Sequence, residues 1–288
     1  MKKMKRFTSI SAAFVLGVTL LTACGTKDNN PAAEPTPEVT GPVLEEIVVG
    51  ASIEPHATIL NSEAVKKSLE ADGFSIKVVE YTDYIQPNVA TSDGSLDANF
   101  FQHIPYLVEY NEKNNTKLKA VVNTHFEPLG IYAGKTDSLE NVKDGAQIAV
   151  PNDATNEARA LLLLEKAGLI TLEENIGLDA TIKNIASNPK NLKIIEVEAA
   201  QTAKSLQDVD LAVINGNYAL AAGLSASKDG LLVEDATSEA ATTYPNAIVV
   251  NEGNEETDKT KALIKAVTSE ETKKFIEEKW QGAVVPVF

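Results

Sequence analysis

Residues 47–81 read IVVGASIEPHATILNSEAVKKSLEADGFSIKVVEY and indicate the fold class most directly. This stretch opens with an apolar run at 47–51, which is typical of a buried strand. A helical segment follows at 62–71 and is ended by Gly73, and a second strand is predicted at 76–81. Two strands joined through a helix form a βαβ unit, and such a unit implies a parallel pair of strands.

The alternation of strands and helices continues along most of the chain. Further strands are predicted at residues 96–100, 120–122, 130–133, 147–150, 192–197, 211–214 and 247–250. Further helices are predicted from Pro87 for a short length and at residues 104–113, 154–167, 202–206, 255–267 and 270–280, the last with a capping-box pattern at 268–271. Repeated βα units predict an α/β protein with parallel-rich sheets flanked by helices, and two successive series of units make two lobes plausible.

The N-terminus carries the pattern of a lipoprotein signal. Mostly basic residues at 2–6 precede an apolar run at 7–20, which is short for a membrane span, and small residues then lead to Cys24. In a bacterial lipobox of this kind the leader, here residues 1–23, is removed and the thiol is acylated, for example with palmitate. A multiply acylated cysteine anchors a protein stably. An ordinary secretory signal with an incidental cysteine is the alternative.

A tether is predicted to follow the lipidated cysteine. Residues 26–43 have low hydrophobicity and repeated prolines, which favour a disordered, extended chain. Residues 24–44 would therefore hold a folded body away from a membrane. The predicted location is the extracytoplasmic face of the cell membrane, with the type of envelope left open.

The composition bounds the class of protein. About 265 residues follow the leader, which is enough for two domains, and 43% of the whole chain is apolar. The chain contains one cysteine, so no disulfide supports the fold. The formal net charge of −15 becomes about −19 without the four basic residues of the leader. A chain this acidic argues against nucleic acid as a partner and against electrostatic adhesion to anionic lipid.

Four aromatic residues gather within 23 positions, although aromatic residues make up only 6% of the chain. They are Tyr84, Phe100, Phe101 and Tyr106, which lie after one predicted strand and where another strand meets a helix. Ligands of open α/β sheets bind at the carboxyl ends of strands, so these rings could line a site for an apolar or thioether side chain. Core packing explains them equally well. At least one of the adjacent phenylalanines belongs in the core, because neighbours in a strand point to opposite faces.

Arg159 lies in the segment 151–161, which follows a predicted strand and opens a helix. Free backbone N–H groups and the positive end of the helix point out of such a junction. No acidic residue lies three or four positions from Arg159, so its guanidinium could clamp a carboxylate. An exposed arginine is the alternative. Asn215, Asn217 and Asn246 lie beside predicted strands, but asparagines in turns are weak signals alone.

The sequence gives no positive argument for catalysis, a cofactor or a metal. The three histidines, His56, His103 and His125, lack the short spacing that is typical of metal ligands. A Gly-x-Ser-x-Gly turn, a P-loop and a GxGxxG motif are absent from the sequence. We therefore predict a protein that is not an enzyme, with no cofactor and no metal site.

Six segments carry a resemblance to a known family. In chain order they are EPH at 54–56, DYIQPN at 83–88, DANFFQH at 97–103, HFEPLGIY at 125–132, PNDATNEARALLLL at 151–164 and INGNYA at 214–219. From about residue 46 to residue 288 the chain resembles the NlpA-type lipoproteins, the methionine-binding proteins of methionine ABC importers. The resemblance implies a two-lobed, type II periplasmic-binding-protein fold that encloses its ligand. Lobe 1 would comprise residues 45–127 plus 246–288, and lobe 2 residues 128–245.

The resemblance also implies roles for individual residues. The methionine side chain would be lined by Tyr84, Phe101, His103 and Tyr106. Arg159 would hold the α-carboxylate, and Asn215 and Asn246 would hydrogen-bond the amino-acid backbone, with Asn217 a further candidate. Two positions depart from the family pattern. Ala154 replaces a usual Pro, which affects only the start of a helix, and Thr82 stands where an aromatic residue can occur, which weakens the inference about side-chain specificity.

The resemblance and the N-terminal signal together imply three partners: a ligand, a transporter and a membrane. L-methionine is the expected ligand, with D-methionine and related forms left open. The protein would be a monomer that delivers its ligand to an ABC permease and its ATPase subunit. The alternatives are a binder of another small amino acid or short methionine-containing peptide, a surface enzyme acting on amino-acid derivatives, and a structural or adhesive lipoprotein.

Overall fold

The parallel pair predicted at residues 47–81 is present in the computed structural model, which describes residues 43–288. β1 (Glu45–Ser52) pairs with β2 (Phe74–Tyr81), and α2 (Glu63–Ala71) lies between them in the chain. The hydroxyl of Ser62 accepts a hydrogen bond from a backbone N–H in the first turn of α2, which satisfies a group that the helix itself leaves free.

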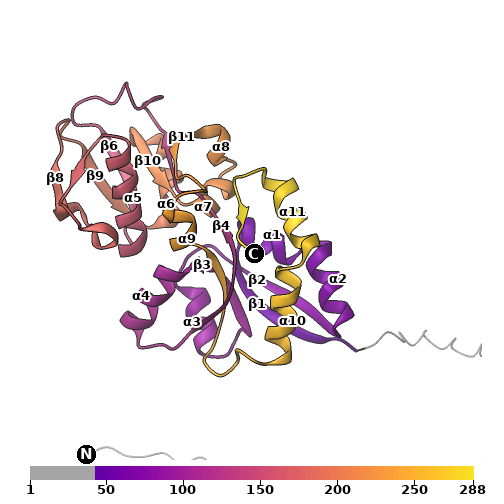
Figure 1. Cartoon of the computed structure of the whole chain (residues 1–288). Coiled ribbons are helices and arrows are strands. Elements are labelled where there is room, and N and C mark those ends of the chain that lie inside the picture. The colour runs from indigo at the N-terminus through magenta and orange to yellow at the C-terminus, as the bar shows by residue number, and fades with distance from the viewer. Residues whose placement is uncertain (1–42) are drawn as a thin grey trace, which may run out of the picture. The chain divides into compact units, whose positions relative to one another are not determined.

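The first sheet has six strands in the order β13–β4–β12–β3–β1–β2 (Figure 1). Its remaining strands are β3 (Ala98–His103), β4 (Lys119–Phe126), β12 (Asn246–Val250) and β13 (Val285–Pro286). β3 is parallel to β1, as predicted, whereas β12 is antiparallel to both β3 and β4. A buried strand has the same apolar pattern in either direction, so the sequence does not predict this reversal.

The second sheet has five strands in the order β11–β5–β10–β6–β9. They are β5 (Gly130–Ala133), β6 (Gln147–Pro151), β9 (Lys193–Val197), β10 (Leu211–Ile214) and β11 (Gly230–Val233). β6 is parallel to β9 and β10, and β5 is antiparallel to β10 and β11. The sequence does not predict β11, nor the separate pair of β7 (Thr171–Leu172) and β8 (Ile185–Ser187).

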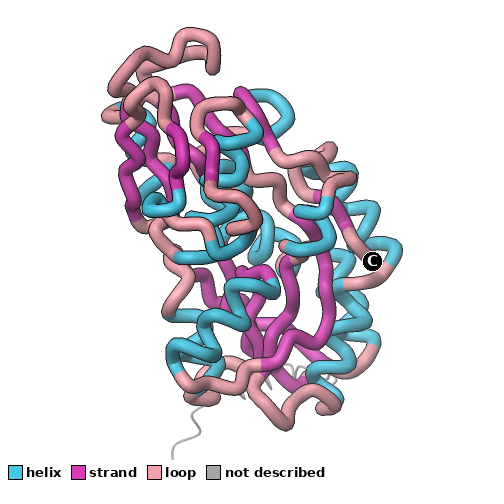
Figure 2. The backbone as a smooth tube through the Cα atoms, turned by 60° about the vertical axis from the view of Figure 1, so that its left-hand side comes forward, coloured by secondary structure: helices cyan, strands magenta, loops and turns pink. Residues whose placement is uncertain are grey.

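Helices cover both faces of the first sheet (Figures 1 and 2). α2, α10 (Asp258–Val267) and α11 (Glu270–Trp280) share an apolar core with one face. α4 (Ile104–Asn114) packs on the other face, and α3 (Gln86–Ser92) is hydrogen-bonded to that face through Asn88. Burial on both faces explains why residues 47–51 of β1 and 247–250 of β12 form continuous apolar runs rather than alternating.

The main helix of the second sheet is α5 (Ala154–Lys166), whose apolar residues pack against β6 and β10. The other helical segments are short. They are η1 (Ile53–Ala57), α1 (Thr58–Leu60), η2 (Gly177–Asp179), η3 (Ile182–Asn184), α6 (Ala199–Thr202), η4 (Lys204–Gln207), α7 (Gly216–Ala221), α8 (Ala226–Asp229) and α9 (Glu239–Thr243).

Three helix predictions are wrong in detail. The helix predicted at 255–267 begins only at Asp258, because Thr257 caps it. The cap of α11 is Ser269 rather than Thr268, because the Thr268 hydroxyl donates to the Ile264 carbonyl and closes the preceding helix. The cap therefore lies one residue later than predicted, and Thr272 stands where a capping box would have Glu or Gln. The helix predicted at 202–206 is replaced by α6, which begins at the helix-favouring Ala199, and by the 3₁₀ turn η4.

The fold is two-lobed, as predicted, because each sheet has its own apolar core. The chain passes between the sheets twice among the described residues, once between β4 and β5 and once between β11 and β12. Figure 2 shows the strands gathered into two corresponding groups. The carboxyl ends of the parallel strands in both groups are where the segments 83–88 and 151–161 begin.

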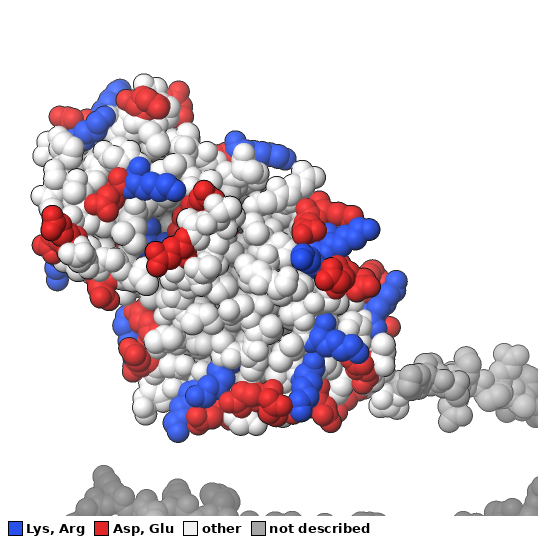
Figure 3. Space-filling model, in the orientation of Figure 1, with Lys and Arg blue, Asp and Glu red and all other residues white. Residues whose placement is uncertain are grey.

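The lipobox and almost all of the tether lie outside the described residues, so those predictions remain predictions. No helix within residues 43–288 combines the length and the apolar character needed to cross a membrane. On the face in Figure 3, acidic and basic side chains are intermixed and lie mostly toward the periphery. This face has no continuous basic patch of the kind that nucleic-acid binding requires.

Candidate functional site

A small cavity of about 20 Å³ lies between elements of the two sheets. The lining residues are Tyr84, Phe101, Gln102, His103, Tyr106, Glu127, Asn156, Arg159, Asn215, Gly216, Asn217 and Asn246. The structure therefore brings together all seven of the predicted ligand-binding residues, together with Asn217.

Three aromatic rings form one wall of this cavity. The ring of Tyr84 lies 5.8 Å from that of Phe101 and 5.7 Å from that of Tyr106, centre to centre. The Tyr106 hydroxyl donates to the main-chain carbonyl of Tyr84 over 3.0 Å, which orients the Tyr106 ring. Phe100 points to the opposite face of β3 and is fully buried in the core. Core packing is thus confirmed for Phe100, as the alternation along a strand predicts, whereas Phe101 lines the cavity and its contact with a ligand stays a prediction.

Polar contacts across the cavity join the two lobes. The Tyr84 hydroxyl donates to the side-chain oxygen of Asn217 over 2.6 Å, and the Tyr218 hydroxyl donates to the carbonyl of Thr82 over 3.2 Å. Burial raises the pKa of Tyr84 well above its ordinary value, helped by the nearby Tyr218 and Glu127. Tyr84 is therefore a neutral hydrogen-bond donor at physiological pH.

His103 lies at the start of α4 with its ring directed into the cavity wall. Its Nδ1 accepts the backbone N–H of Tyr106 over 3.2 Å, so Nε2 carries the hydrogen and donates to Asn156 Oδ1 over 3.1 Å. Burial, reinforced by the positive charge of Arg159, lowers the pKa of His103 to about 3. The imidazole is therefore neutral, and its orientation is set at both nitrogens.

Arg159 is paired with Glu234, a contact that the sequence does not predict. Its Nε donates to Glu234 Oε1 over 2.7 Å, and Nη2 donates to Glu234 Oε2 and, over 2.8 Å, to the carbonyl of Glu127. Burial alone would lower the pKa of Arg159. The negative charge of Glu234 and its hydrogen bonds outweigh burial, so the pKa of Arg159 is raised above its ordinary value. Among the described residues no hydrogen bond involves Nη1, so this end of the guanidinium is available to a ligand.

The asparagines sit close to these groups. Asn215 donates from Nδ2 to Asn156 Oδ1 over 2.8 Å, while its own Oδ1 is buried without a partner among the described residues. Asn246 Oδ1 lies 3.0 Å from His56 Nε2 and accepts its hydrogen. Asn215 and Asn246 thus remain candidates for hydrogen bonds to a ligand, and Asn215 has an acceptor free for one.

The sequence does not predict roles for three polar residues that line the cavity, Gln102, Glu127 and Asn156, nor for Glu234, the partner of Arg159. Asn156 could have been found, because it lies one helical turn before Arg159 on the same helix. Glu234 follows β11, a strand that the sequence pattern does not reveal, and lies 75 residues from Arg159. Glu127 follows β4 directly, but a single carboxylate after a strand carries no distinctive signal.

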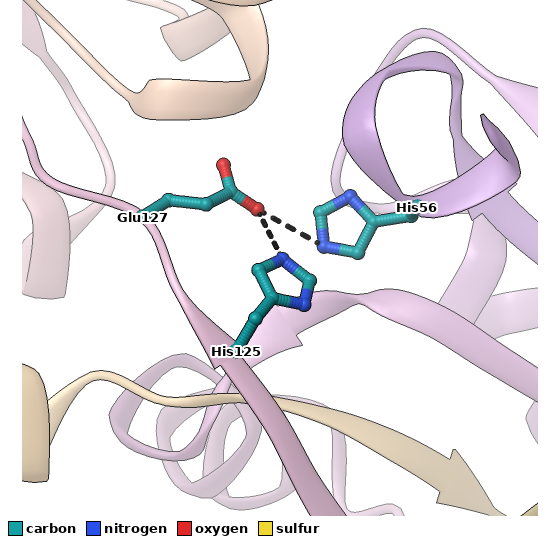
Figure 4. A group of neighbouring side chains, drawn as sticks. All are labelled: His56, His125 and Glu127. Atoms are coloured by element: carbon teal, nitrogen blue, oxygen red, sulfur yellow. Dashed lines mark hydrogen bonds and ion pairs between the residues drawn. The ribbon is translucent and has the colours of Figure 1, made fainter. Parts of the chain in front are cut away.

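Glu127 also belongs to a buried cluster with two histidines (Figure 4). His125 Nε2 lies 2.8 Å, and His56 Nε2 lies 3.3 Å, from the same oxygen, Glu127 Oε1. Burial lowers the pKa of His125 to about 3 and that of His56 to about 4. Sequence spacing does not predict this cluster because its two histidines are 69 positions apart. The 2.8 Å separation is that of a hydrogen bond between His125 Nε2 and Glu127, whereas His56 Nε2 gives its hydrogen to Asn246 and lies near Glu127 without a hydrogen bond to it.

The three buried histidines should make the protein less stable in acid. Their ordinary pKa is 6.5, whereas the folded values are about 3 for His103 and His125 and about 4 for His56. Below pH 6.5 the unfolded chain therefore binds protons that the folded chain does not. The free energy of unfolding should fall by up to about 1.4 kcal/mol per pH unit for each histidine, down to the folded pKa values.

Urea unfolding at several pH values between 7.5 and 5 would measure this slope. The raised pKa values of Glu127, Asp153 and Glu157, caused mainly by burial, act in the opposite sense because the folded chain takes up those protons first. Replacing His125 with Asn removes one titrating group and should flatten the slope. An unchanged slope in this variant would contradict the neutral, buried state of His125.

Comparison with known proteins gives a consistent result. The sequence profile of the NlpA lipoprotein family matches residues 47–288. A probable D-methionine-binding lipoprotein MetQ of Pasteurella multocida is 40% identical over 268 residues, which cover 93% of this chain and 95% of that protein. The D-methionine-binding lipoprotein MetQ of Escherichia coli K12 is 38% identical over 285 residues, which cover 98% of each chain.

Solved structures agree with the fold. A nutrient-binding protein from Burkholderia cenocepacia, whose structure was determined bound to methionine, superposes with a TM-score of 0.79 at 43% identity. The superposition covers 84% of this chain and all of the other.

Proposed function

Because the chain belongs to the NlpA lipoprotein family, we propose that it binds methionine between its two lobes and delivers it to an ABC permease. The observation that carries the proposal is the cavity itself. It combines an aromatic wall with one unoccupied end of a buried guanidinium, which are the two features that a thioether amino acid requires. Such a protein catalyses no reaction, and its relatives of this kind are binding proteins.

The aromatic wall would receive the methionine side chain. The ring centres of Tyr84, Phe101 and Tyr106 lie 5.7, 5.8 and 6.0 Å apart in the three pairs. Contacts between a thioether sulfur and an aromatic ring contribute roughly 0.3–1.5 kcal/mol each. Since the sulfur can touch more than one ring, methionine should bind more tightly than norleucine, which has the same length and lacks sulfur.

The Arg159 Nη1 group would hold the ligand's α-carboxylate. The salt bridge with Glu234 fixes the plane of the guanidinium before any ligand arrives, which reduces the entropy lost on binding. The carboxylate would then add charge-assisted hydrogen bonds to a group that is already oriented. Asn215 and Asn246 would complete the contacts to the ligand backbone.

Calorimetry on ligand-stripped protein tests the proposal. The titrants are L-methionine, D-methionine, norleucine and a set of other amino acids. We expect saturable heat with methionine and a weaker signal with norleucine. Absence of binding to either methionine enantiomer would overturn the proposal, and tighter binding of another amino acid or of a short methionine-containing peptide would favour that alternative.

Closure of the lobes would keep the ligand in place. We propose that the lobes divide at residues 127/128 and 245/246, so that residues 45–127 plus 246–288 form lobe 1 and residues 128–245 form lobe 2. The hydrogen bonds Tyr84–Asn217 and Tyr218–Thr82 connect the two parts so defined. They would break when the lobes separate to admit or release methionine, and the closed form would be the one that a permease recognises.

The chain would act at the extracytoplasmic face of the cell membrane, held there as a monomer by acylated Cys24. Replacing Cys24 with Ser should release the protein from the membrane, because a hydroxyl is not acylated in this way, and should leave methionine affinity unchanged. Fractionation of cells followed by calorimetry measures both effects. Thr26→Ser serves as a control that keeps the thiol, and membrane retention of the Cys24→Ser protein would contradict the proposed anchor.

A further inference from the structure

A second pocket lies within residues 159–244, a part of the proposed lobe 2, and has a volume of about 430 Å³. We call it the lobe 2 pocket. α5 forms one side of it, η2 another and the segment around α9 the third. Figure 3 shows a hollow in this lobe with acidic and basic side chains at its edge. The volume lies in the range of roughly 300–1,000 Å³ that is typical of small-molecule sites. Among the described residues only Arg159 lines both this pocket and the cavity between the lobes.

The hydroxyl of Tyr244 points to an occupant of the lobe 2 pocket. Tyr244 is 4% exposed and lines this pocket but not the cavity, and its hydroxyl has no hydrogen-bond partner in the described part of the chain. Burial raises the pKa of Tyr244 to about 12 against the opposing charge of Arg159, so the hydroxyl keeps its hydrogen at neutral pH. A buried hydroxyl without a partner costs free energy, and a ligand in the pocket would supply the missing group.

α5 presents an apolar surface to the pocket between two basic residues. At helical spacing, one face of α5 carries the pocket residues Arg159, Leu162, Leu163 and Lys166. The two basic residues are seven positions apart, which is about 10 Å along a helix, and the leucines fill the space between them. From η2, Leu178 adds an apolar side chain that is 49% exposed. The apolar part of a small ligand would cover these leucines and remove their surface from water.

Two opposite charges that line the lobe 2 pocket have no partner within the described protein. Lys166 in the last turn of α5 and Glu239 in α9 are both exposed, and neither takes part in an ion pair between described residues. The other two charges of the pocket, Arg159 and Glu234, neutralise each other. A ligand with a single charge would leave one of the two exposed charges unpaired, whereas a zwitterion could meet both. Exposed ion pairs contribute little individually, so these charges would select the ligand more than they tighten its binding.

Tyr244 connects the lobe 2 pocket with residues of the cavity. Its ring centre lies 4.4 Å from the guanidinium carbon of Arg159 and 5.2 Å from the ring centre of His103. A ligand that bonds to the Tyr244 hydroxyl would hold this ring, and through it the guanidinium, in one position. Coupled sites change each other's affinity by the same factor, so a ligand in the pocket and one in the cavity should favour each other's binding.

We propose that the lobe 2 pocket is a second binding site, which takes a small zwitterion with an apolar side chain, that is, an amino acid of the leucine type. The ligand carboxylate would pair with Lys166 and its ammonium group with Glu239. The Tyr244 hydroxyl, which can donate or accept, would bond to the same polar end. The apolar side chain would lie on the leucines of α5 and η2. This site goes beyond the proposed function, because it lies in one lobe and not between the two.

Calorimetry with L-leucine on methionine-saturated protein tests the inference. We expect one leucine to bind with a dissociation constant that does not rise when the methionine concentration is raised further. A constant that rises in proportion to methionine would show that leucine only competes for the cavity, and would overturn the inference. Two analogues test the charges: 4-methylpentanoate lacks the amine of leucine, and 3-methylbutylamine lacks its carboxylate. Each should bind at least about threefold more weakly than leucine, and equal affinity for either would contradict the requirement for a zwitterion.

Variants locate the binding of leucine in the pocket. Ala240→Trp places a large side chain in the pocket and should abolish leucine binding. The matched control is Ala241→Trp, because Ala241 is the next residue of α9 and is equally half-buried but does not line the pocket. Tyr244→Phe removes only the hydroxyl and should weaken leucine about 2- to 10-fold, as expected for one neutral hydrogen bond. Unchanged leucine affinity in Ala240→Trp would overturn the inference, and unchanged affinity in Tyr244→Phe would contradict the role of the hydroxyl.

The outcomes separate this inference from the proposed function. Phe101→Ala alters the cavity, and Ala240→Trp alters the pocket. If methionine does not bind, but leucine binding is lost in Ala240→Trp and kept in Phe101→Ala, the proposed function is wrong and the pocket site stands. If leucine binding is lost in Phe101→Ala and kept in Ala240→Trp, leucine occupies the cavity and the pocket site is wrong. Absence of leucine binding to both methionine-saturated and ligand-stripped protein would also overturn the inference.

Discussion

Replacing Arg159 with Met is expected to lower methionine affinity at least about a hundredfold and to destabilise the folded protein. The loss of affinity follows from the charge-assisted hydrogen bonds to the ligand carboxylate, which contribute about 1.5–3 kcal/mol each. The loss of stability has a separate cause. Glu234 would remain almost buried without its partner, which costs about 3–5 kcal/mol in comparable buried pairs.

A second variant separates these two causes. In the double variant Arg159→Met/Glu234→Gln no buried charge is left alone, so the free energy of unfolding should recover most of its loss. Methionine affinity should not recover, because the carboxylate still lacks its partner. Urea unfolding measures the first quantity and calorimetry the second. Methionine affinity that returns together with stability would show that Arg159 acts only through the fold.

Replacing Phe100 with Ala is expected to lower the free energy of unfolding by about 3–5 kcal/mol, as for other large buried aromatic side chains. Phe100 is fully buried and packs edge-on against His56, with ring centres 4.6 Å apart, and against His125, with ring centres 5.3 Å apart. Its removal would leave a cavity in the core of the first sheet, where neighbouring strands and helices cannot close it fully.

The adjacent residue provides the matched comparison. Phe101 has the same side chain and lies in the same strand, but it lines the cavity in which we propose that methionine binds. Phe101→Ala should therefore lower methionine affinity more than Phe100→Ala does, while Phe100→Ala should lower stability more. Unfolding and calorimetry on both variants check this crossed pattern. Equal effects of the two changes on affinity would contradict the assignment of Phe101 to the wall of the site.

The predicted elements agree well with the structure where the apolar pattern is strong. The strands at 47–51, 147–150 and 211–214 differ from β1, β6 and β10 by a few terminal residues at most, because each is bounded by polar or turn-forming residues. β11 was missed because it is short and pairs only with β5 at the edge of the sheet. The antiparallel pairs were missed because strand direction depends on distant connections rather than on local pattern.

The sequence predicts the residues of the candidate site that follow strands, but it does not predict contacts between distant segments. Residues that follow strands, such as Tyr84 and Asn215, could be selected because strand ends converge in this class of fold. The pairing of Arg159 with Glu234 could not, since it joins segments 75 positions apart. Local helix geometry determines only the neighbours three and four positions away, and Glu234 is not among them. The roles of all these residues in binding remain predictions that the variants above test.

One imidazole touches both of the segments that connect the sheets. His56 Nε2 lies 3.3 Å from Glu127 Oε1 on the first passage and 3.0 Å from Asn246 Oδ1 on the second. His56 thus contacts both connections. We therefore expect the two connections to bend together about one common axis rather than twist independently. His56→Leu removes both contacts. Distances between two spin labels, one on each lobe, should therefore spread over a wider range in that variant. A single well-defined axis means that the lobes return to the same alignment each time they close.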